Sequence, residues 1–320
     1  MRILALVPGG ISDQLLFFPA LDDIKRAYPN AEIGVVVEPK ASGAYRVSRI
    51  VDAVVPFSFS AAKSPSDWAN LLGVVRDREY EVVLCADNSW STGLMLWLSG
   101  IPTRIAYAST KAPYFYTATV STEAKYQADR YHDLLSGAGM DGDAPALAIN
   151  VPEADIKWAD ALRDRLSLKD GYVLMYPGPT TAYGDKQARY PLDNWQTLIK
   201  DFQSKQPELP IALLQTDDSS EMVTALKNQD NQLVVTTAQN LGQAAALIAG
   251  ANLVISPDSH IMQLAVALKV FTLALFGKNQ PEEMLPPEEG EDTRFLGLTA
   301  GSKKITDIKP EAILQKVWGG

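Results

Sequence analysis

Residues 4–13 read Leu4-Ala5-Leu6-Val7-Pro8-Gly9-Gly10-Ile11-Ser12-Asp13. An apolar run ends in two glycines, and an acid follows three residues later at the start of an amphipathic segment. This order predicts a buried strand, a tight turn and a carboxylate on the first turn of a helix. In open α/β sheets, ligands bind beyond the strand ends, where helix N-termini offer free backbone N–H groups. We therefore expect Asp13 at a ligand-binding edge.

Apolar runs of strand length recur along the whole chain, with helical patterns between them. In the first half we expect strands at 3–7, 32–37, 53–57, 82–86, 104–107 and 146–149, and helices at 15–28, 67–78 and 126–136. In the second half we expect strands at 172–176, 211–215, 233–236, 253–256 and 272–276, and helices at 194–202, 219–229, 241–250 and 259–268. The strands are continuously apolar, which is typical of parallel sheets covered on both faces.

The length of 320 residues and the hydrophobic content of 47% suit two domains. The predicted fold class is α/β, with two doubly wound Rossmann-like domains facing across a cleft. We expect an N-terminal domain at 1–155 and a C-terminal domain at 156–320, joined near a helix at 155–166. The Pro- and Glu-rich residues 280–292 predict an exposed loop, and Asp193 is a candidate N-cap for the helix that follows it.

Charge and cysteine content exclude several classes of protein. The net charge of −9 disfavours a nucleic-acid partner or a polybasic membrane binder. The first residues are too short for a signal-peptide core, and no run approaches the ~20 apolar residues of a membrane span. The single cysteine, Cys85, forms no intrachain disulfide and is expected to be a small buried hydrophobe. These features favour a cytoplasmic location.

A second polar cluster, Tyr176-Pro177-Gly178-Pro179-Thr180-Thr181, directly follows a predicted strand, and Lys186 and Arg189 come soon after it. Backbone amides, hydroxyls and two cations near a strand end suit a diphosphate. The alternative is an ordinary solvated loop.

A third cluster places Asp258 at a strand end and Ser259 and His260 at the start of a helix. A carboxylate there can accept sugar hydroxyls while N–H groups bind phosphate. The alternative is a simple N-cap. The first cluster has a structural alternative too. Gly9 and Gly10 could serve only to form the turn, and Asp13 could be an acid that the dipole at the helix N-terminus stabilises.

Other signals carry less weight. Asp141-Gly142-Asp143 has the D-x-D spacing of some metal sites, but it lies in a Gly-rich segment that predicts a turn. His132 and His260 are the only histidines, so we expect no metal site, and His132 lies in a helical pattern that favours a structural role. The dinucleotide fingerprint G-x-G-x-x-G and the nucleophile elbow G-x-S-x-G are both absent.

Taken in order, the three clusters resemble the heptosyltransferase family (glycosyltransferase family 9). The resemblance covers nearly the whole chain. It rests on Ser12-Asp13-Gln14-Leu15-Leu16-Phe17-Phe18-Pro19-Ala20-Leu21, Asp129-Arg130-Tyr131, Tyr176-Pro177-Gly178, Lys186 with Arg189-Tyr190-Pro191-Leu192-Asp193-Asn194-Trp195, and the stretch 246–255. The family consists of two-domain GT-B proteins that transfer a sugar, typically heptose from ADP-heptose, in lipopolysaccharide core assembly.

The resemblance implies an inverting glycosyltransferase with Asp13 as an ionised general base of pKa near ~4. Lys186, Thr180, Thr181 and the amides near Ser259 would stabilise the leaving nucleoside diphosphate without a metal or other cofactor. The remaining candidate donor-binding residues are Gly9, Gly10, Ser12, Gly178, Arg189, Asp258 and His260. The implied partners are a nucleotide-diphosphate sugar and a cell-envelope glycolipid or glycan, with a peripheral position at the inner membrane face.

The chain departs from the family pattern at the third cluster. The usual Asp-[Ser/Thr]-Gly-x-x-His becomes Asp258-Ser259-His260-Ile261-Met262-Gln263, and the Gly before the base becomes Ser12. Lys278 or His260 is a candidate replacement cation. An alternative function is therefore a non-catalytic sugar-nucleotide or glycan binding protein on the same scaffold. A third reading, a nucleotide-sugar epimerase, lacks recognisable acid and base partners.

Overall fold

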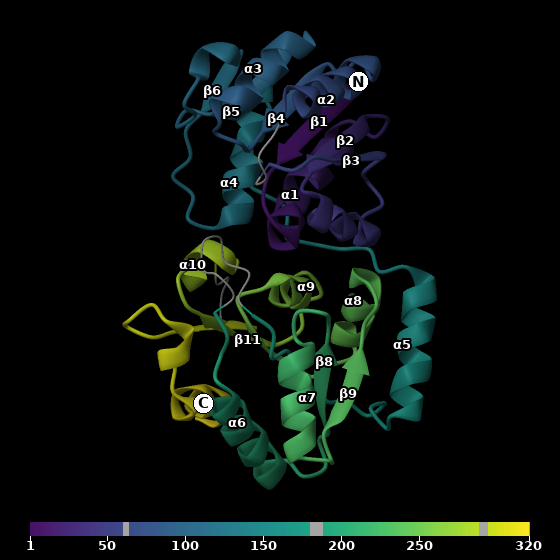
Figure 1. Ribbon diagram of the computed structural model, residues 1–320, viewed down its shortest axis with the longest axis vertical. Helices are drawn as coiled ribbons and strands as arrows, with labels where there is room; N and C mark the ends of the chain where they lie inside the picture. Colours follow the sequence, from purple (N-terminus) through teal and green to yellow (C-terminus); the bar gives the residue numbers. More distant parts are fainter. Residues whose placement is uncertain (60–63, 180–187, 288–293, 320) are drawn as a thin grey trace. The chain divides into compact units, whose positions relative to one another are not determined.

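The computed structural model describes residues 1–59, 64–179, 188–287 and 294–319. The chain divides into two compact units, Met1–Ala148 and Ile149–Gly320 (Figure 1). Each unit is an α/β layer structure built on its own six-stranded parallel sheet. The predicted α/β class with two doubly wound sheets is confirmed.

The sheet of the first unit has the order β3-β2-β1-β4-β5-β6, with every neighbouring pair parallel. Its strands are β1 (Arg2–Val7), β2 (Glu32–Val37), β3 (Ala53–Pro56), β4 (Val82–Cys85), β5 (Thr103–Tyr107) and β6 (Ala118–Val120). Successive strands extend the sheet in one direction from β1 and then in the other from β4. The point between these two strands is the topological switch point, where α/β folds bind ligands.

The helices of the first unit are α1 (Ile11–Ala27), α2 (Pro65–Asp77), α3 (Trp90–Ser99) and α4 (Gln127–Asp133). The short 3-10 helices are η1 (Pro39–Val47), η2 (Pro113–Phe115) and η3 (Leu134–Ala138). Helix α1 packs against α4 and η1, while α2 packs against α3. These contacts bury the apolar strands, β1 above all, since residues 3–7 are almost fully excluded from solvent.

The second unit repeats this topology. Its sheet order is β12-β11-β10-β7-β8-β9, so the switch point lies between β7 and β10. The strands are β7 (Val173–Met175), β8 (Ile211–Gln215), β9 (Val234–Thr237), β10 (Leu253–Pro257), β11 (Thr272–Phe276) and β12 (Phe295–Thr299). The helical segments are α5 (Glu153–Arg165), α6 (Leu192–Lys205), α7 (Ser220–Gln229), α8 (Leu241–Ala249), α9 (His260–Ala267), α10 (Pro281–Met284), η4 (Ile305–Asp307) and α11 (Pro310–Trp318).

The structure differs from the predicted pattern in a few places. Residues 146–149 form no strand, and the strands β6 and β12 form where none was predicted. Helix α1 begins earlier than predicted because Gly10 serves as its N-cap. Pro191, not Asp193, caps α6, so Asp193 lies inside the first turn. Helix α10 forms within the expected loop at 280–292.

Candidate functional site

The Asp13 carboxylate is fixed at the start of α1, directly beyond the end of β1. The backbone N–H of Gly10 donates to Oδ2 at 2.8 Å, and the Tyr131 hydroxyl of α4 donates to Oδ1 at 3.0 Å. An ionised carboxylate offers about four lone-pair sites. These two bonds therefore orient the group and still leave acceptor capacity for a substrate hydroxyl.

Gly9 provides the room that this carboxylate occupies. Its φ of +116° lies in the region that L side chains rarely adopt, and a Cβ there would lie 2.3 Å from Oδ2 of Asp13. A side chain at this position would strain the backbone and displace the carboxylate. The predicted tight turn at Gly9 and Gly10 is confirmed, and Ser12 beside it is buried.

Two buried side chains that the sequence patterns did not single out hold this turn. The side-chain amide of Gln14 donates to the Val7 carbonyl at 3.0 Å, and the Tyr45 hydroxyl donates to Oε1 of Gln14 at 2.7 Å. On the neighbouring helix, the ring of Tyr131 packs against Phe17 with centroids 5.3 Å apart. A glutamine on an otherwise apolar helix face is the signal that points to such a role.

Burial raises the pKa of Asp13 above its ordinary value of 3.8, while the hydrogen bonds from Gly10 and Tyr131 lower it and only partly offset the burial. Burial therefore opposes the ionised form that the sequence predicts for Asp13. A higher pKa makes the ionised form a stronger base, because the ideal catalytic pKa lies closer to the operating pH. Perturbed carboxyls at strand ends are typical of functional sites.

The neighbouring strand β4 also ends in an acid, Asp87, but this carboxylate is already satisfied. It accepts hydrogen bonds from the backbone and hydroxyl of Ser89 and from the Thr92 hydroxyl. Ser89 is itself the N-cap of α3. Asp87 therefore completes a helix cap, and Asp13 is the better candidate base.

In the second unit, the predicted second cluster leaves the end of β7 beside β10. Tyr176 is fully buried, and its hydroxyl lies 3.4 Å from Oγ1 of Thr216 at the end of β8. A Cβ on Gly178 would lie 2.1 Å from Cζ of Tyr176, so the glycine lets the backbone fold back over that ring. Pro179 pairs with Arg189 through an isolated antiparallel bridge.

Arg189 brings a cation to this edge. Its Nη1 is buried and has no hydrogen-bond partner among the residues that the structure describes. A guanidinium nitrogen in this state is suited to an incoming anion. Thr180, Thr181 and Lys186, which the sequence also predicts here, lie outside the described residues.

The third cluster leaves β10, which pairs with β7, so the second and third clusters share one sheet edge. Asp258 is buried and accepts a hydrogen bond at 2.8 Å from the amide of Asn279, a residue that sequence reasoning missed. Ser259 is the N-cap of α9, with its hydroxyl 2.9 Å from that of Ser256. The cap interpretation of Ser259 is thus confirmed, and its role toward a ligand stays a prediction.

His260 and Gln263 occupy the positions at which the chain departs from the family pattern. Burial lowers the pKa of His260 to about 4, so the imidazole is neutral at physiological pH, which disfavours it as a replacement cation. Its ring contacts that of Tyr176, with centroids 6.2 Å apart. Gln263 is fully buried and donates to the Met284 carbonyl at 2.8 Å, while its Oε1 has no partner among the described residues.

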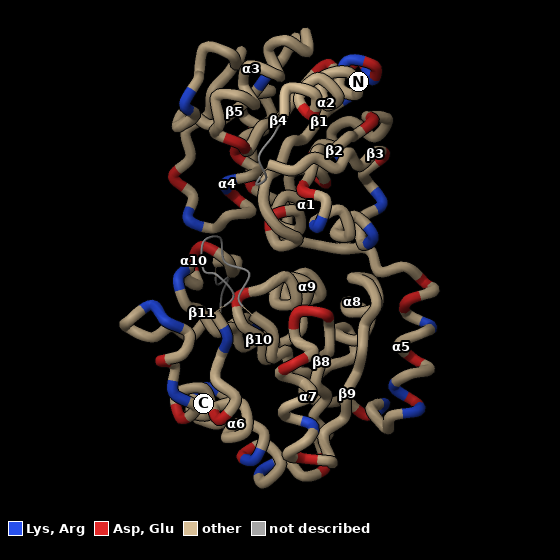
Figure 2. The backbone as a smooth tube through the Cα atoms, in the orientation of Figure 1, with Lys and Arg blue, Asp and Glu red and all other residues tan. Residues whose placement is uncertain are grey.

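Other polar groups have structural explanations. The predicted turn at Gly142 is present, with φ of +145°, and His132 pairs with Asp23 at 3.1 Å. Among the described residues, no group of three His, Cys, Asp or Glu side chains could hold a metal ion. Figure 2 shows acidic and basic residues interspersed along the chain.

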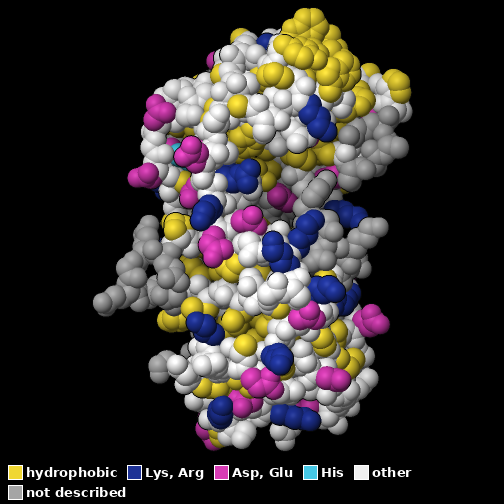
Figure 3. All heavy atoms as spheres, turned by 90° about the vertical axis from the view of Figure 1, so that its left-hand side faces the viewer, with side chains coloured by type: hydrophobic (Ala, Val, Ile, Leu, Met, Phe, Trp, Pro, Cys, Tyr) yellow, Lys and Arg dark blue, Asp and Glu magenta, His cyan; other side chains and the backbone are white. Residues whose placement is uncertain are grey.

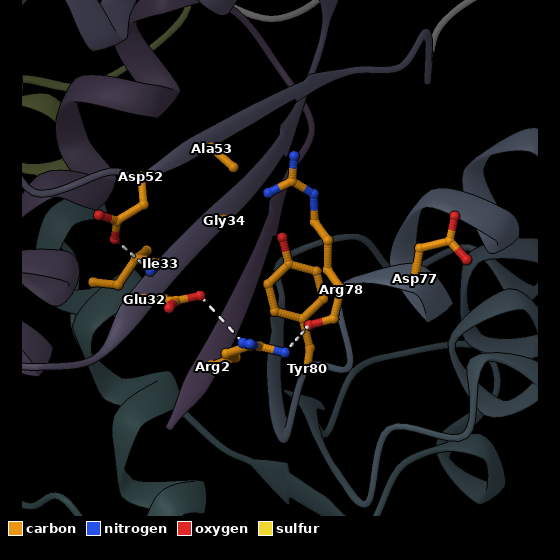
Figure 4. A pocket seen from close by; sticks show the side chains of 9 residues that line it. All are labelled: Arg2, Glu32, Ile33, Gly34, Asp52, Ala53, Asp77, Arg78 and Tyr80. Carbon is orange, nitrogen blue, oxygen red and sulfur yellow. Dashed lines mark hydrogen bonds and ion pairs between the residues drawn. The ribbon is translucent and has the colours of Figure 1, made fainter.

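A pocket in the first unit lies at the other end of the strands from Asp13. It is lined by Arg2, Glu32, Ile33, Gly34, Asp52, Ala53, Asp77, Arg78 and Tyr80 (Figure 4). Within it, Arg2 forms an ion pair with Glu32, and Asp52 forms one with Lys25. Arg2 donates to Glu32 and to the Arg78 carbonyl, and Asp52 accepts from the Ile33 N–H. Ligand sites in such sheets lie at the carboxyl ends of strands, so this pocket is not the candidate site.

Two six-stranded parallel sheets of identical order, each with polar clusters at its switch point, define an α/β protein of the GT-B class. The family model of Glycosyltransferase family 9 (heptosyltransferase) matches residues 68–307. The chain belongs to this family. The matched residues include the second and third clusters and begin after Asp13.

The chain is similar to an enzyme of the family and also to a subunit of a photosynthetic complex. Lipopolysaccharide heptosyltransferase 2 of Salmonella typhimurium is 21% identical over 347 residues, which cover 99% of this chain and 97% of the relative. The photosynthetic NDH subunit of subcomplex B 1 of Arabidopsis thaliana is 20% identical over 331 residues, which cover 96% of this chain and 71% of the relative. The family resemblance is thus accompanied by similarity to a subunit of a larger assembly.

Solved structures share the fold over almost the entire chain. A family 9 glycosyltransferase from Veillonella parvula has a TM-score of 0.83 at 18% identity, covering 99% of this chain and 96% of that one. The ADP-heptose lipopolysaccharide heptosyltransferase II of Escherichia coli has a TM-score of 0.77 at 18% identity, covering 99% and 97%. Escherichia coli heptosyltransferase WaaC, solved with ADP, has a TM-score of 0.75 at 17% identity, covering 99% of each chain.

Proposed function

We propose that this protein is an inverting glycosyltransferase that moves a sugar from a nucleoside-diphosphate donor to a hydroxyl of a cell-envelope glycolipid. Asp13 is the general base. The observation that carries the proposal is the Asp13 carboxylate itself, held at the switch point by two hydrogen bonds and with a raised pKa.

In the proposed reaction, Asp13 takes the proton from the acceptor hydroxyl as that oxygen attacks the anomeric carbon of the donor. The bond between the anomeric carbon and the diphosphate oxygen breaks, and its electron pair leaves with the nucleoside diphosphate. Attack opposite the leaving group inverts the anomeric centre. A base that takes a proton in the transition state typically contributes about 10²–10⁴-fold in rate.

The second unit is the proposed donor-binding part. Arg189 and the turn at Gly178 support it, because a guanidinium whose Nη1 is buried without a partner among the described residues, together with backbone amides, can neutralise a diphosphate without a metal. Thr180, Thr181 and Lys186 are proposed to complete the cradle, with Asp258 and Ser259 on the sugar side. Since related structures are solved with ADP and an ADP-heptose analogue, we propose an adenine nucleotide sugar as the donor. The proposed location is the cytoplasmic face of the membrane that carries the acceptor.

The test replaces Asp13 with Asn and measures both donor binding and transfer. Asp13→Asn should lose at least about a hundredfold in transfer rate, while calorimetry should give donor affinity close to that of the wild type. Asp23→Asn is the matched control, since Asp23 lies on the same helix and also bonds to an α4 side chain, His132. Full transfer by Asp13→Asn would reject this carboxylate as the base.

A second candidate function is a non-catalytic binding protein on the same scaffold. His260 and Gln263 favour it, because buried side chains stand where the family pattern has Gly and His. The similarity to an NDH subunit also favours it. Binding of sugar nucleotides without release of nucleoside diphosphate, in the presence of envelope lipid, would support this alternative over the enzyme.

A further inference from the structure

Large apolar side chains are exposed together on one part of the first unit. They are Trp90 (50% exposed), Trp97 (53%), Leu98 (42%) and Tyr114 (68%), from α3 and η2. Figure 3 shows a dense hydrophobic group at the top of the view, the end of the first unit at which Figure 1 labels α3. We call these four residues the aromatic patch. An apolar patch of this kind marks a binding surface.

The aromatic patch is a packed structure and not a set of loose side chains. Phe115 lies at its centre, with ring centroids 5.9 Å from Trp90, 6.2 Å from Trp97 and 4.6 Å from Tyr114. The indole N–H of Trp90 donates to the Tyr114 hydroxyl at 3.0 Å. Gly93 permits this packing, because a Cβ there would lie 3.0 Å from the Phe115 ring. The exposed rings are therefore fixed in place, so that they would lose little conformational entropy on binding a partner.

Helix α3 is apolar on both of its faces. Met95 and Leu96 are buried on the inner face, while Trp97 and Leu98 are exposed. A surface helix normally carries charged residues on its outer side, and a helix that is apolar all round is one that something covers. In Figure 2 the α3 tube is tan along its length, without a charged residue.

The segment that carries the aromatic patch holds cations but no acid, whereas the neighbouring helix α2 carries Asp67 and Asp77 beside Arg76. Residues 88–122 include Arg104 and Lys111 but no Asp or Glu, in a chain with a net charge of −9. Arg104 donates to the Phe115 carbonyl at 2.7 Å, and Arg76 of α2 donates to the Leu98 carbonyl at 2.9 Å. Asp87, the acid that precedes α3, is hydrogen-bonded by Ser89 and Thr92.

From these observations we infer that the aromatic patch docks on the surface of a bilayer that contains anionic lipid. Trp and Tyr are the side chains enriched at membrane–water interfaces, where an apolar ring meets a polar tip. The flanking cations Arg104 and Lys111 complement anionic headgroups. Helix α3 has 10 residues, about half the ~20 needed to span a bilayer, so it lies in the interface. No helix among the described residues is long and apolar enough to cross a membrane.

The test measures co-sedimentation with vesicles of phosphatidylcholine, with and without phosphatidylglycerol. The wild type should bind the anionic vesicles, and the double variant Trp90→Gln, Trp97→Gln should lose about tenfold or more of that binding. Phe271→Gln is the matched control, because Phe271 is equally exposed (52%) but lies in the second unit. Lys111→Gln should weaken binding to anionic vesicles and leave binding to neutral ones unchanged.

Quenching of the wild-type tryptophan fluorescence by lipids brominated in the acyl chain gives a readout that needs no variant to fold. Quenching is expected, because Trp90 and Trp97 would enter the interface. Absence of quenching, or equal binding by the double variant and the wild type, would overturn the inference. So would a concentration-dependent dimer that the double variant abolishes, because the aromatic patch would then be a contact between copies of this chain. None of these measurements needs catalysis, so the result is independent of the role proposed for Asp13.

Discussion

The hydroxyl of Tyr131 donates a hydrogen bond to Oδ1 of Asp13 at 3.0 Å, linking α4 to the first turn of α1. Tyr131 is buried and packed against Phe17, so its own geometry is fixed. The bond favours the ionised carboxylate, whereas burial opposes it. The protonation of the candidate base thus depends on a residue far from it in the sequence.

Tyr131→Phe should therefore move the acid limb of the kcat/KM profile to higher pH. Removing the donor destabilises the ionised form and so raises the pKa of Asp13 further. Well above that pKa, kcat should stay within a few fold. The measurement is a pH–rate profile together with NMR titration of the Asp13 carboxyl. Tyr172→Phe is the control, because Tyr172 is buried in the second unit and its hydroxyl donates to the Leu247 carbonyl. An unmoved acid limb would contradict the prediction.

Gly9→Ala should disable the site while leaving the rest of the fold intact. The new Cβ would lie 2.3 Å from Oδ2 of Asp13, so the carboxylate must move. Displacement of a catalytic group by about 1 Å costs about a hundredfold in rate. Gly139→Ala separates this effect from backbone strain, because Gly139 has φ of +75° but a Cβ added there would meet nothing within 4 Å. If both variants lose transfer activity equally, displacement of the carboxylate is not the cause.

Gly178→Ala should weaken binding of a nucleoside diphosphate. A methyl group there would lie 2.1 Å from the Tyr176 ring and must push it toward Thr216 or His260. The displaced turn would no longer present its backbone as the proposed diphosphate site requires, so the Kd for ADP should rise about tenfold, or about 1.4 kcal/mol. Calorimetry measures the effect. Gly301→Ala provides the comparison, since an added Cβ meets nothing there within 4 Å, and equal affinities for both variants would argue against this donor edge.

The burial of His260 should lower the free energy of unfolding in mild acid. Its pKa is about 4 in the folded state because of burial, and 6.5 is the ordinary value. Between these values the unfolded chain binds a proton that the native state does not, so stability falls as the pH drops from 6.5 to about 4. The loss attributable to this residue is up to about 3 kcal/mol. Urea unfolding at several pH values should show a smaller loss for His260→Gln, and an unchanged pH dependence would refute the assignment.

Much of the architecture follows from local patterns. Continuous apolar runs such as those in β1 and β2, separated by amphipathic helices, predict parallel sheets because only helices on both faces can cover such strands. The position of Asp13 on the first helical turn follows from the two glycines before it. Short strands such as β6 escape prediction, because three residues carry too little periodicity and their place depends on hydrogen bonds to β5.

Local sequence patterns predict part of the candidate site and miss the part that depends on long-range contacts. The residues at the ends of β7 and β10 are predictable as strand-end clusters, since each follows its own apolar run. Their adjacency is not, because it depends on the pairing of two strands far apart in sequence. Asn279 and Thr216 were missed for the same reason, since each reaches its partner only through the sheet order.

The sequence by itself determined the class of fold, the strand-end position of Asp13 and the departures at His260 and Gln263, because these depend on neighbours within a few residues. The tertiary structure decided the protonation of His260 and Asp13 and the assembly of the aromatic patch on the surface. Burial makes His260 neutral and raises the pKa of Asp13, and packing around Phe115 brings Trp90, Trp97 and Tyr114 together on the exterior. Desolvation and long-range contacts have no local signature, so only the folded chain fixes them.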